Sequence, residues 1–268
     1  MSSVDRWLAQ EEDPMKALVR RPSPRLAEGI VTHLDRTPVD SALAVRQWEG
    51  YVAALREHGW QTLEVPPAHD CPDSAFVEDT MVVYERTAVI ARPGADARKP
   101  ETADAERAVR DLGYAIVRIE APGTLDGGDV LKVGSTVFVG RGGRTNGDGI
   151  RQLREALSPL GATVIAVPLT KVLHLKSAVT ALPDGTVVGY PPLVDDVTMF
   201  GRFLPVPEES GSHVVLLDSQ TLLMAADAPQ TARLFEDLGW RVVTVDIGEY
   251  EKLEGCVTCL SVRLRGLG

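Results

Sequence analysis

The segment Leu-Gly-Tyr-Ala-Ile-Val-Arg-Ile-Glu-Ala-Pro, residues 112–122, carries the pattern that predicts the fold. A helix-like run ends there at a glycine, which is the residue expected just after a helix. A short strand of β-branched and other apolar residues follows, and a proline ends it. The pattern recurs at HGWQTLEVPP (58–67), LGATVIAVPL (160–169) and LGWRVVTVDIG (238–248), with a fainter copy at FGRFLPVPEE (200–209).

The sequence around these copies predicts helices and hairpins. The helix-like stretches are 41–56, 102–112, 148–160 and 229–238, and hairpins are expected within 82–91, 130–139, 179–189 and 214–225. Five similar units of strands with one helix each, repeating every ~40–55 residues, favour a closed radial array. An open α/β sheet with chance similarity between its helix ends is the alternative. No low-complexity linker divides the chain, so we predict one domain over residues 1–268.

The composition argues against several classes of function. Of the 268 residues, 44% are hydrophobic and 25% charged, which suffices for a packed core. The net charge of -10 argues against binding nucleic acid or an anionic membrane, since both need a basic surface. The longest apolar runs fall well short of the ~18 residues of a membrane span, and residues 1–16 lack the apolar core of a secretion signal. Three cysteines do not make a disulfide framework, so we expect a cytoplasmic protein.

An acidic segment, residues 72–80, brings three carboxylates together in Pro-Asp-Ser-Ala-Phe-Val-Glu-Asp-Thr. Asp73, Glu78 and Asp79 could belong to a solvated turn. The apolar pair between them indicates instead that part of the segment is buried. Buried carboxylates need a cation, and a guanidinium or ammonium substrate is one candidate.

A glycine pair lies in a second acidic segment, Thr-Leu-Asp-Gly-Gly-Asp-Val, residues 124–130. Two adjacent glycines allow a tight turn and a close approach of the backbone, so Asp126 could lie at a site. A plain hairpin turn is the alternative. A phosphate-binding loop is not supported, because carboxylates beside the glycines would repel phosphate.

Two arginines and one histidine have settings that fit a binding site. Arg98 and Arg144 lie in loops, and arginine is the natural bidentate partner of a carboxylate, although each could be an ordinary surface residue. His174 lies among apolar residues and could be a satisfied core histidine. Because its unperturbed pKa is about 6.5, it is also a candidate general base.

The C-terminal segment Leu-Glu-Gly-Cys-Val-Thr-Cys-Leu-Ser-Val-Arg-Leu, residues 253–264, contains a C-x-x-C pair. The alternation after Gly255 predicts a strand on which Cys256 and Cys259 point to opposite faces. A redox C-x-x-C normally opens a helix, and no second pair completes a zinc site. Cys259, which would point away from the core face of that strand, could be a reachable nucleophile, with a redox pair and a zinc half-site as the alternatives.

Six motifs, in chain order, resemble those of the dimethylarginine dimethylaminohydrolases in the guanidine-modifying (amidinotransferase/deiminase) superfamily. They are PDSAFVEDT, ARPGADARKPET, APGTLDGGDV, GRTN, KVLHLKSA and LEGCVTCLSVRL. The resemblance spans roughly Met15 to Leu264. It implies a pentein fold, which is a five-bladed, pseudo-symmetric α/β propeller of ββαβ-type units with the active site in a central channel.

The resemblance also implies roles for individual residues. Cys259 would be the nucleophile, His174 its acid–base partner and Asp126 a carboxylate beside the guanidinium, where some members carry Glu. The residues that would contact the substrate are Asp73, Glu78, Asp79, Arg98 and Arg144, the two arginines gripping its carboxylate. The loop of about residues 20–34 would be a mobile lid with main-chain contacts near Ile30.

The implied reaction is hydrolysis of Nω-methylated arginines to citrulline and methylamine or dimethylamine through a covalent S-alkylthiouronium on Cys259. It needs no metal or organic cofactor and has a small molecule as its partner; the oligomeric state is open, a homodimer included. An arginine or agmatine deiminase would use the same cysteine and histidine. A non-catalytic arginine-binding module and a thiol-redox protein are the alternatives from other classes.

Overall fold

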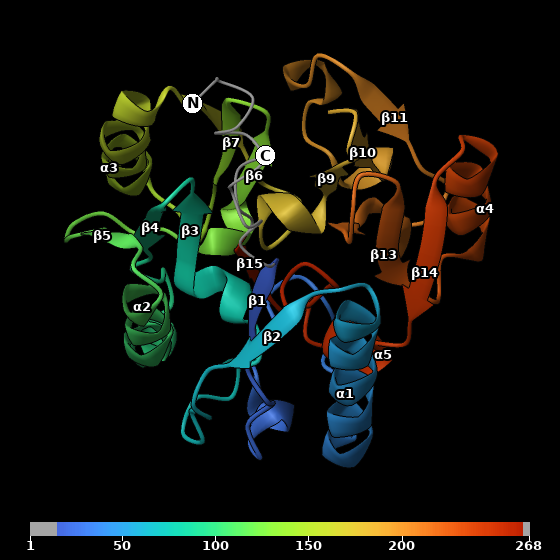
Figure 1. The fold of residues 1–268 in the computed structure, drawn as a ribbon, viewed down its shortest axis with the longest axis horizontal. Coiled ribbons are helices and arrows are strands. Elements are labelled where there is room, and N and C mark those ends of the chain that lie inside the picture. The colour runs from blue at the N-terminus through green and yellow to red at the C-terminus, as the bar shows by residue number, and fades with distance from the viewer. Residues whose placement is uncertain (1–14, 265–268) are drawn as a thin grey trace, which may run out of the picture.

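The computed structural model describes residues 15–264, so the first 14 residues assessed for a secretion signal lie outside it. Five three-stranded sheets surround a centre, and the long helices lie on the outside (Figure 1). In each sheet an antiparallel pair of strands is followed by a crossover to a third, parallel strand. The predicted closed array of five repeated units is confirmed, and the open sheet is wrong.

Four of the units contain a helix of at least two turns. The second comprises β3 (Met81–Tyr84), β4 (Thr87–Ile90), α2 (Thr102–Asp111) and β5 (Ala115–Arg118). The third comprises β6 (Val130–Val133), β7 (Thr136–Arg141), α3 (Gly147–Leu157) and β8 (Thr163–Pro168). The fifth comprises β12 (Val215–Leu216), β13 (Thr221–Ala225), α4 (Pro229–Asp237) and β14 (Arg241–Val245), followed by the short α5 (Gly248–Glu251).

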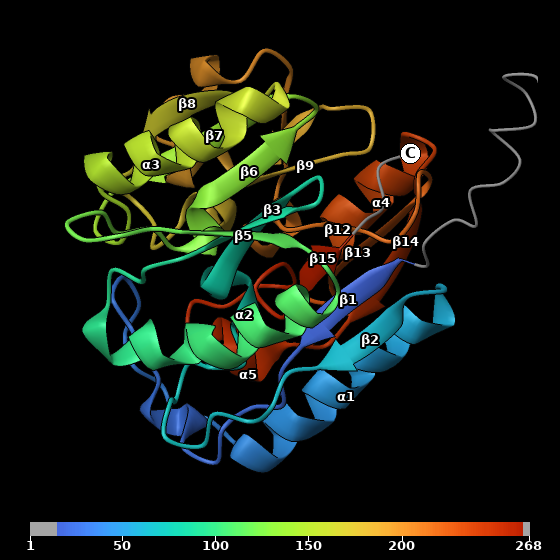
Figure 2. The ribbon, with the colours of Figure 1, turned by 60° about the vertical axis from the view of Figure 1, so that its left-hand side comes forward.

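The first unit is assembled from both ends of the chain. Its strands are β15 (Val262–Leu264), β1 (Lys16–Val19) and β2 (Gln61–Glu64), with α1 (Ser41–Glu57) in the crossover. Strand β15 pairs antiparallel with β1, so that Leu18 lies opposite Val262. Figure 2 shows β15 beside β1 at the middle of the molecule. This pairing closes the ring.

The fourth unit lacks the helix that the repeat predicts. It comprises β9 (Val179–Ala181), β10 (Val187–Gly189) and β11 (Phe203–Pro205), and its crossover contains only 3-10 turns. Pro191 and Pro192 supply no backbone N–H, so they suit the start of a short turn and oppose a longer helix. The prediction of one helix per unit is therefore wrong here, whereas the predicted hairpins and the other helices are confirmed.

The C-terminal segment also differs from prediction. Residues 257–260 form a turn, and the strand begins only at Val262. Glu254 has a φ of 59°, and a Cβ on Gly255 would lie 2.3 Å from the ring of Phe76, so the chain bends where an extended strand was expected. The Cys259 amide donates to the Cys256 carbonyl at 3.0 Å. Cys259 thus lies in a tight turn at the centre of the propeller.

Burial is organised between the units. The buried apolar side chains form five clusters, and each joins neighbouring units. One cluster combines Leu18 of β1 and Val262 of β15 with Met81 of β3, for example. Leu260, just before β15, is fully buried. Within the described residues, no helix is both long and apolar enough to cross a membrane.

Candidate active site

Seven of the nine residues singled out in the sequence line one small cavity of about 10 Å³. They are Ile30, Asp73, Asp79, Arg98, Arg144, His174 and Cys259. Asp126 contacts this group through His174, whereas Glu78 faces a different part of the centre. The structure therefore brings together a thiol, an imidazole and several carboxylates from segments far apart in the chain.

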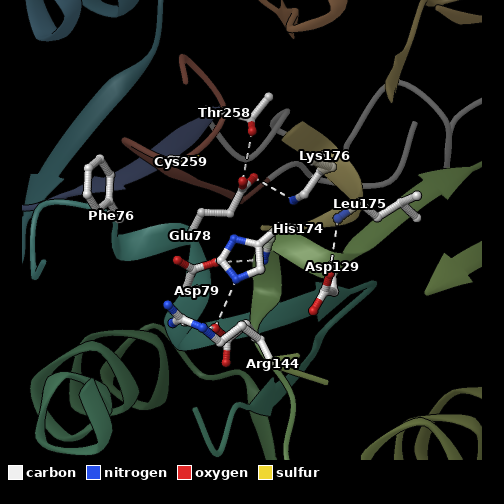
Figure 3. Close-up of polar contacts among 12 residues, drawn as sticks. Phe76, Glu78, Asp79, Asp129, Arg144, His174, Leu175, Lys176, Thr258 and Cys259 are labelled. Atoms are coloured by element: carbon white, nitrogen blue, oxygen red, sulfur yellow. Dashed lines mark hydrogen bonds and ion pairs between the residues drawn. The ribbon is translucent and has the colours of Figure 1, made fainter. Parts of the chain in front are cut away.

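The imidazole of His174 is held between carboxylates. Its Nε2 lies 2.9 Å from Asp126 Oδ2, and its Nδ1 lies 3.8 Å from Asp79 Oδ1. Figure 3 shows the ring beside Asp79. The glycine pair allows this packing, because a Cβ on Gly128 would lie 2.7 Å from His174 Nδ1.

These carboxylates control the charge of the imidazole. Burial disfavours the imidazolium, but Asp79 and the hydrogen bond to Asp126 outweigh it and raise the pKa of His174 to about 9. Burial opposes ionisation of Asp79 too, yet His174 and Arg98 together lower the pKa of Asp79 to about 2. At neutral pH His174 is therefore a charged acid, able to donate a proton.

Arg98 is engaged with protein groups. Its Nη1 donates to Asp79 Oδ2 at 2.6 Å, and its Nε and Nη2 donate to the carboxylate of Glu101. Nη2 also reaches the carbonyl oxygens of Asp73 and Phe76. Of the five N–H groups of a guanidinium, these contacts leave one on Nη1 for another partner.

Arg144 has a more open arrangement. Its Nη1 lies 3.7 Å from Asp126 Oδ2, its one ion pair among the described residues. The loop that carries it is fixed by the next residue, since Thr145 Oγ1 donates to Asp129 Oδ2 and accepts the Asp126 amide. Arg144 is therefore placed at the cavity with most of its hydrogen-bonding capacity unused.

Asp129 connects the Arg144 loop with the His174 loop. Besides the bond from Thr145, its carboxylate accepts the Leu175 amide at 3.0 Å, as Figure 3 shows. Complete burial raises the pKa of Asp129 to about 6, although His174 and Thr145 favour its ionised form. Asp129 was not among the residues singled out from the sequence. The sequence feature that could have identified it is its position as the acidic residue directly after the glycine pair.

Glu78 faces away from the small cavity. Its Oε1 lies 2.6 Å from Lys176 Nζ, and its Oε2 accepts Thr258 Oγ1 at 2.9 Å (Figure 3). The same Oε1 lies 2.8 Å from Arg263 Nη2. These residues line a second cavity, of about 410 Å³. The Glu78 carboxylate is held by these partners and does not line the small cavity with Cys259 and His174.

The nucleophile candidate is a buried thiol next to another. Cys259 is 5% exposed, and its Sγ lies 3.4 Å from Cys256 Sγ. The hydrogen bond with Cys256, burial and the carboxylates Glu78 and Asp79 all raise the pKa of Cys259 above its ordinary value. The predicted placement of the two side chains on opposite faces of a strand is therefore wrong. The turn brings them together.

The predicted lid, residues 20–34, reaches the cavity at Ile30. The Ile30 amide donates to Asp73 Oδ1 at 3.0 Å. The amides of Thr32 and His33 donate to the carboxylate of Glu254 at 2.5 and 2.8 Å. Burial raises the pKa of Asp73, while Arg98 and the Ile30 amide oppose the rise. Glu254 was not singled out from the sequence.

One cluster of side chains has the composition of a metal site, although no metal site was predicted from the sequence. Asp79, Asp126 and His174 could each offer a ligand atom within 4.8 Å of the others. Their atoms already bond to one another or to neighbouring donors, including the Arg98 guanidinium and the Gly94 amide. We interpret the cluster as the hydrogen-bonded surround of the imidazole.

Comparison with known proteins identifies the family. No protein-family model matches the chain. It is 67% identical to the N(G),N(G)-dimethylarginine dimethylaminohydrolase of Streptomyces coelicolor over 252 residues, which is 94% of this chain and 98% of the relative. The chain belongs to the dimethylarginine dimethylaminohydrolase family. The corresponding enzyme of Pseudomonas aeruginosa is 35% identical, over 92% of this chain and 98% of its own.

A solved structure supports the fold. A cysteine-to-serine variant of the P. aeruginosa dimethylarginine dimethylaminohydrolase, in complex with citrulline, has a TM-score of 0.87 and 33% identity to this chain. The match covers 94% of this chain and 99% of that one. The family resemblance stated from the six motifs is confirmed.

The charge of His174 should make stability depend on pH. The folded pKa of about 9 lies above the unfolded value of 6.5, so its contribution is full below pH 6.5 and is lost as pH rises towards 9. The difference corresponds to about 3 kcal/mol. Urea unfolding of the wild type should show a loss of unfolding free energy between pH 6.5 and pH 9.5. In His174→Gln the same rise in pH should cost less, by about 3 kcal/mol. Equal losses in both proteins would contradict this assignment of charge.

The lid should loosen when its contact with Glu254 is removed. Glu254→Ala deletes the acceptor of two backbone amides, and each such bond to a charged group is worth about 1.5 kcal/mol or more. Hydrogen exchange at Thr32 and His33 should rise on the order of tenfold. Glu28→Ala is the control, because its carboxylate contacts Arg25 within the lid. Unchanged exchange in Glu254→Ala would show that other contacts close the lid.

Proposed function

We propose that this protein hydrolyses Nω-methylated arginines, asymmetric dimethylarginine and monomethylarginine, to citrulline and dimethylamine or methylamine. The observation that carries the proposal is the convergence of Cys259, His174 and Asp79 on one cavity. The named relatives, one of them in complex with citrulline, support the choice of substrate class.

The substrate would lie with its guanidinium towards the carboxylates. Asp79 and Asp126 can accept hydrogen bonds from its N–H groups and fix the plane of the cation. Its α-carboxylate would face Arg144, which has little other engagement, and could take one further hydrogen bond from Arg98 Nη1. Both ends of a methylated arginine thus have partners of opposite charge.

Binding of the cation would also activate the nucleophile. The pKa of Cys259 is raised in the free site, so the resting group is a thiol. A guanidinium beside the sulfur adds a positive charge, which favours the thiolate. The sulfur then attacks the central guanidinium carbon, and the carboxylates stabilise the positive charge during attack.

His174 would handle the protons of both half-reactions. As an imidazolium it donates a proton to the departing amine when the C–N bond breaks, leaving an S-alkylthiouronium on Cys259. The neutral imidazole then takes a proton from water as the water attacks that carbon. Breaking the C–S bond releases citrulline and restores the thiol.

The closed cavity implies that the lid moves during turnover. A volume of about 10 Å³ is at the lower limit for a single water molecule, and an arginine derivative is far larger. We propose that the lid, residues 20–34, opens to admit substrate and closes to exclude water during attack.

The remaining expectations stay part of the proposal. We place the enzyme in the cytoplasm, because its three cysteines are unpaired thiols. We further propose a single catalytic domain over residues 1–268, a small molecule as partner, and chemistry that uses only side chains and water.

The deciding measurement is citrulline release by the purified protein from asymmetric dimethylarginine and, separately, from arginine. We expect release from the methylated substrate alone. Cys259→Ser should abolish it, whereas Cys256→Ser should keep most of it, because Cys256 does not line the substrate cavity. Release mainly from arginine would make the enzyme a deiminase. Equal loss in both variants would favour thiol-redox chemistry.

The role of Arg144 can be separated from that of the catalytic groups. Arg144→Ala should raise KM for substrates with a free α-carboxylate by about tenfold or more, with a smaller effect on kcat. Agmatine lacks the carboxylate, so any turnover of it should change little. If agmatine turnover falls equally, Arg144 acts on the catalytic geometry and does not clamp the carboxylate.

A further inference from the structure

The C-x-x-C pair in the catalytic turn has one member that the proposed reaction does not use. Cys256 is 2% exposed and belongs, with Cys259, to the apolar cluster around α1 and α5. Its Sγ lies 3.4 Å from that of Cys259 and 3.3 Å from Thr258 Oγ1. The proposed nucleophile therefore has a second thiol in contact with it that can react with its sulfur.

We propose that Cys256 and Cys259 form an oxidative modification site, at which a hydroperoxide converts the two thiols into an intramolecular disulfide. Cys256 is the resolving thiol in this reaction. The modification concerns the nucleophile of the proposed function, so its effect on turnover rests on that function, whereas formation of the bond does not.

The geometry of the turn fits such a bond. The 3.0 Å hydrogen bond from the Cys259 amide to the Cys256 carbonyl makes residues 256–259 a β-turn, in which the first and fourth Cα atoms lie within about 7 Å. Disulfides join Cα atoms about 4.4–6.8 Å apart, with sulfurs about 2.05 Å apart. Side-chain rotation that brings the sulfurs about 1.4 Å closer therefore suffices.

The chemistry balances without a metal or organic cofactor. The thiolate of one cysteine attacks an oxygen of the hydroperoxide, the O–O bond breaks, and a sulfenic acid forms with release of hydroxide or alkoxide. The thiol of the other cysteine then attacks that sulfur, which expels water and forms the S–S bond. Two thiols are oxidised by two electrons and the hydroperoxide is reduced by two. A dithiol reverses the change by exchange.

The surroundings favour the second step over further oxidation. The two sulfurs are already in contact, so a sulfenic acid on Cys259 would form directly beside the Cys256 sulfur. The hydrogen bond from Cys259 lowers the pKa of Cys256 to about 5, so the pair holds one thiolate at neutral pH. Transfer of the shared proton from Cys259 to Cys256 leaves the thiolate on Cys259, which lines the cavity and meets the hydroperoxide. Cys71, the third cysteine, has Glu101 and Arg20 as its electrostatic neighbours and not this pair, so it is no partner for the bond.

The consequence would be reversible loss of the nucleophile. As a disulfide, Cys259 cannot attack a guanidinium, and it is protected from oxidation to the irreversible sulfinic acid. A protein lacking Cys256 would lose that protection and become more sensitive to lasting inactivation.

The test treats the reduced full-length protein with hydrogen peroxide and measures intact mass, peptide maps and citrulline release. The wild type should lose two hydrogen atoms, give a peptide with Cys256 joined to Cys259, and lose activity at least about tenfold, with recovery on dithiothreitol. Cys71→Ser is the matched control and should behave identically. Cys256→Ser should instead take up a sulfenic-acid probe at Cys259 and, with time, gain two oxygen atoms and stay inactive.

The outcomes separate the modification from the proposed function. Sulfenic or sulfinic acid on wild-type Cys259, with no Cys256–Cys259 peptide, would overturn the inference even if the protein hydrolyses methylarginine normally. A disulfide that forms while citrulline release continues would confirm the modification site and refute Cys259 as the nucleophile. A disulfide that instead includes Cys71 would overturn the pairing proposed here.

Discussion

The antiparallel pairing of β15 with β1 is the interaction on which the rest of the structure depends. It builds one sheet from both ends of the described chain and closes the ring. Because β15 follows the Cys256–Cys259 turn almost directly, the same pairing places the thiol at the centre. Each sheet has only three strands, so the pairing and the apolar clusters between units must together hold the ring.

Several charged groups are buried at this centre. The balance between its carboxylates and its cations sets the protonation state of His174. Asp79 and Asp126 would be costly to bury without cations, and His174 and Arg98 supply them. The carboxylates keep the imidazole protonated, as an acid for a departing amine needs. Of the two arginines that line the small cavity, Arg144 has the longer ion pair, 3.7 Å from Asp126 Oδ2, and is the one proposed to meet the α-carboxylate.

The sequence predicted the ring and most of the site, because repeats and motifs are local signals. The glycine-ended copies and the hairpins have the predicted bounds within a few residues. Three features were not predicted. Alternation alone could not reveal the bend that the positive φ of Glu254 and the packing of Phe76 on Gly255 impose. The helix missing from the fourth unit did have a local signal, Pro191-Pro192, which the repeat pattern outweighed. The direction of the Glu78 carboxylate leaves no pattern in a motif, since it depends on tertiary contacts.

The buried carboxylate of Asp129 shows how recognition and chemistry are mechanically joined. One oxygen accepts Thr145 Oγ1, beside Arg144, and the other accepts the Leu175 amide, beside His174. Thr145 in turn accepts the Asp126 amide, and Asp126 holds the imidazole. A displacement of the Arg144 loop therefore reaches His174 by two short hydrogen-bonded routes. Because close-packed interiors transmit strain, the loop that would grip the α-carboxylate and the group that would protonate the amine cannot move independently.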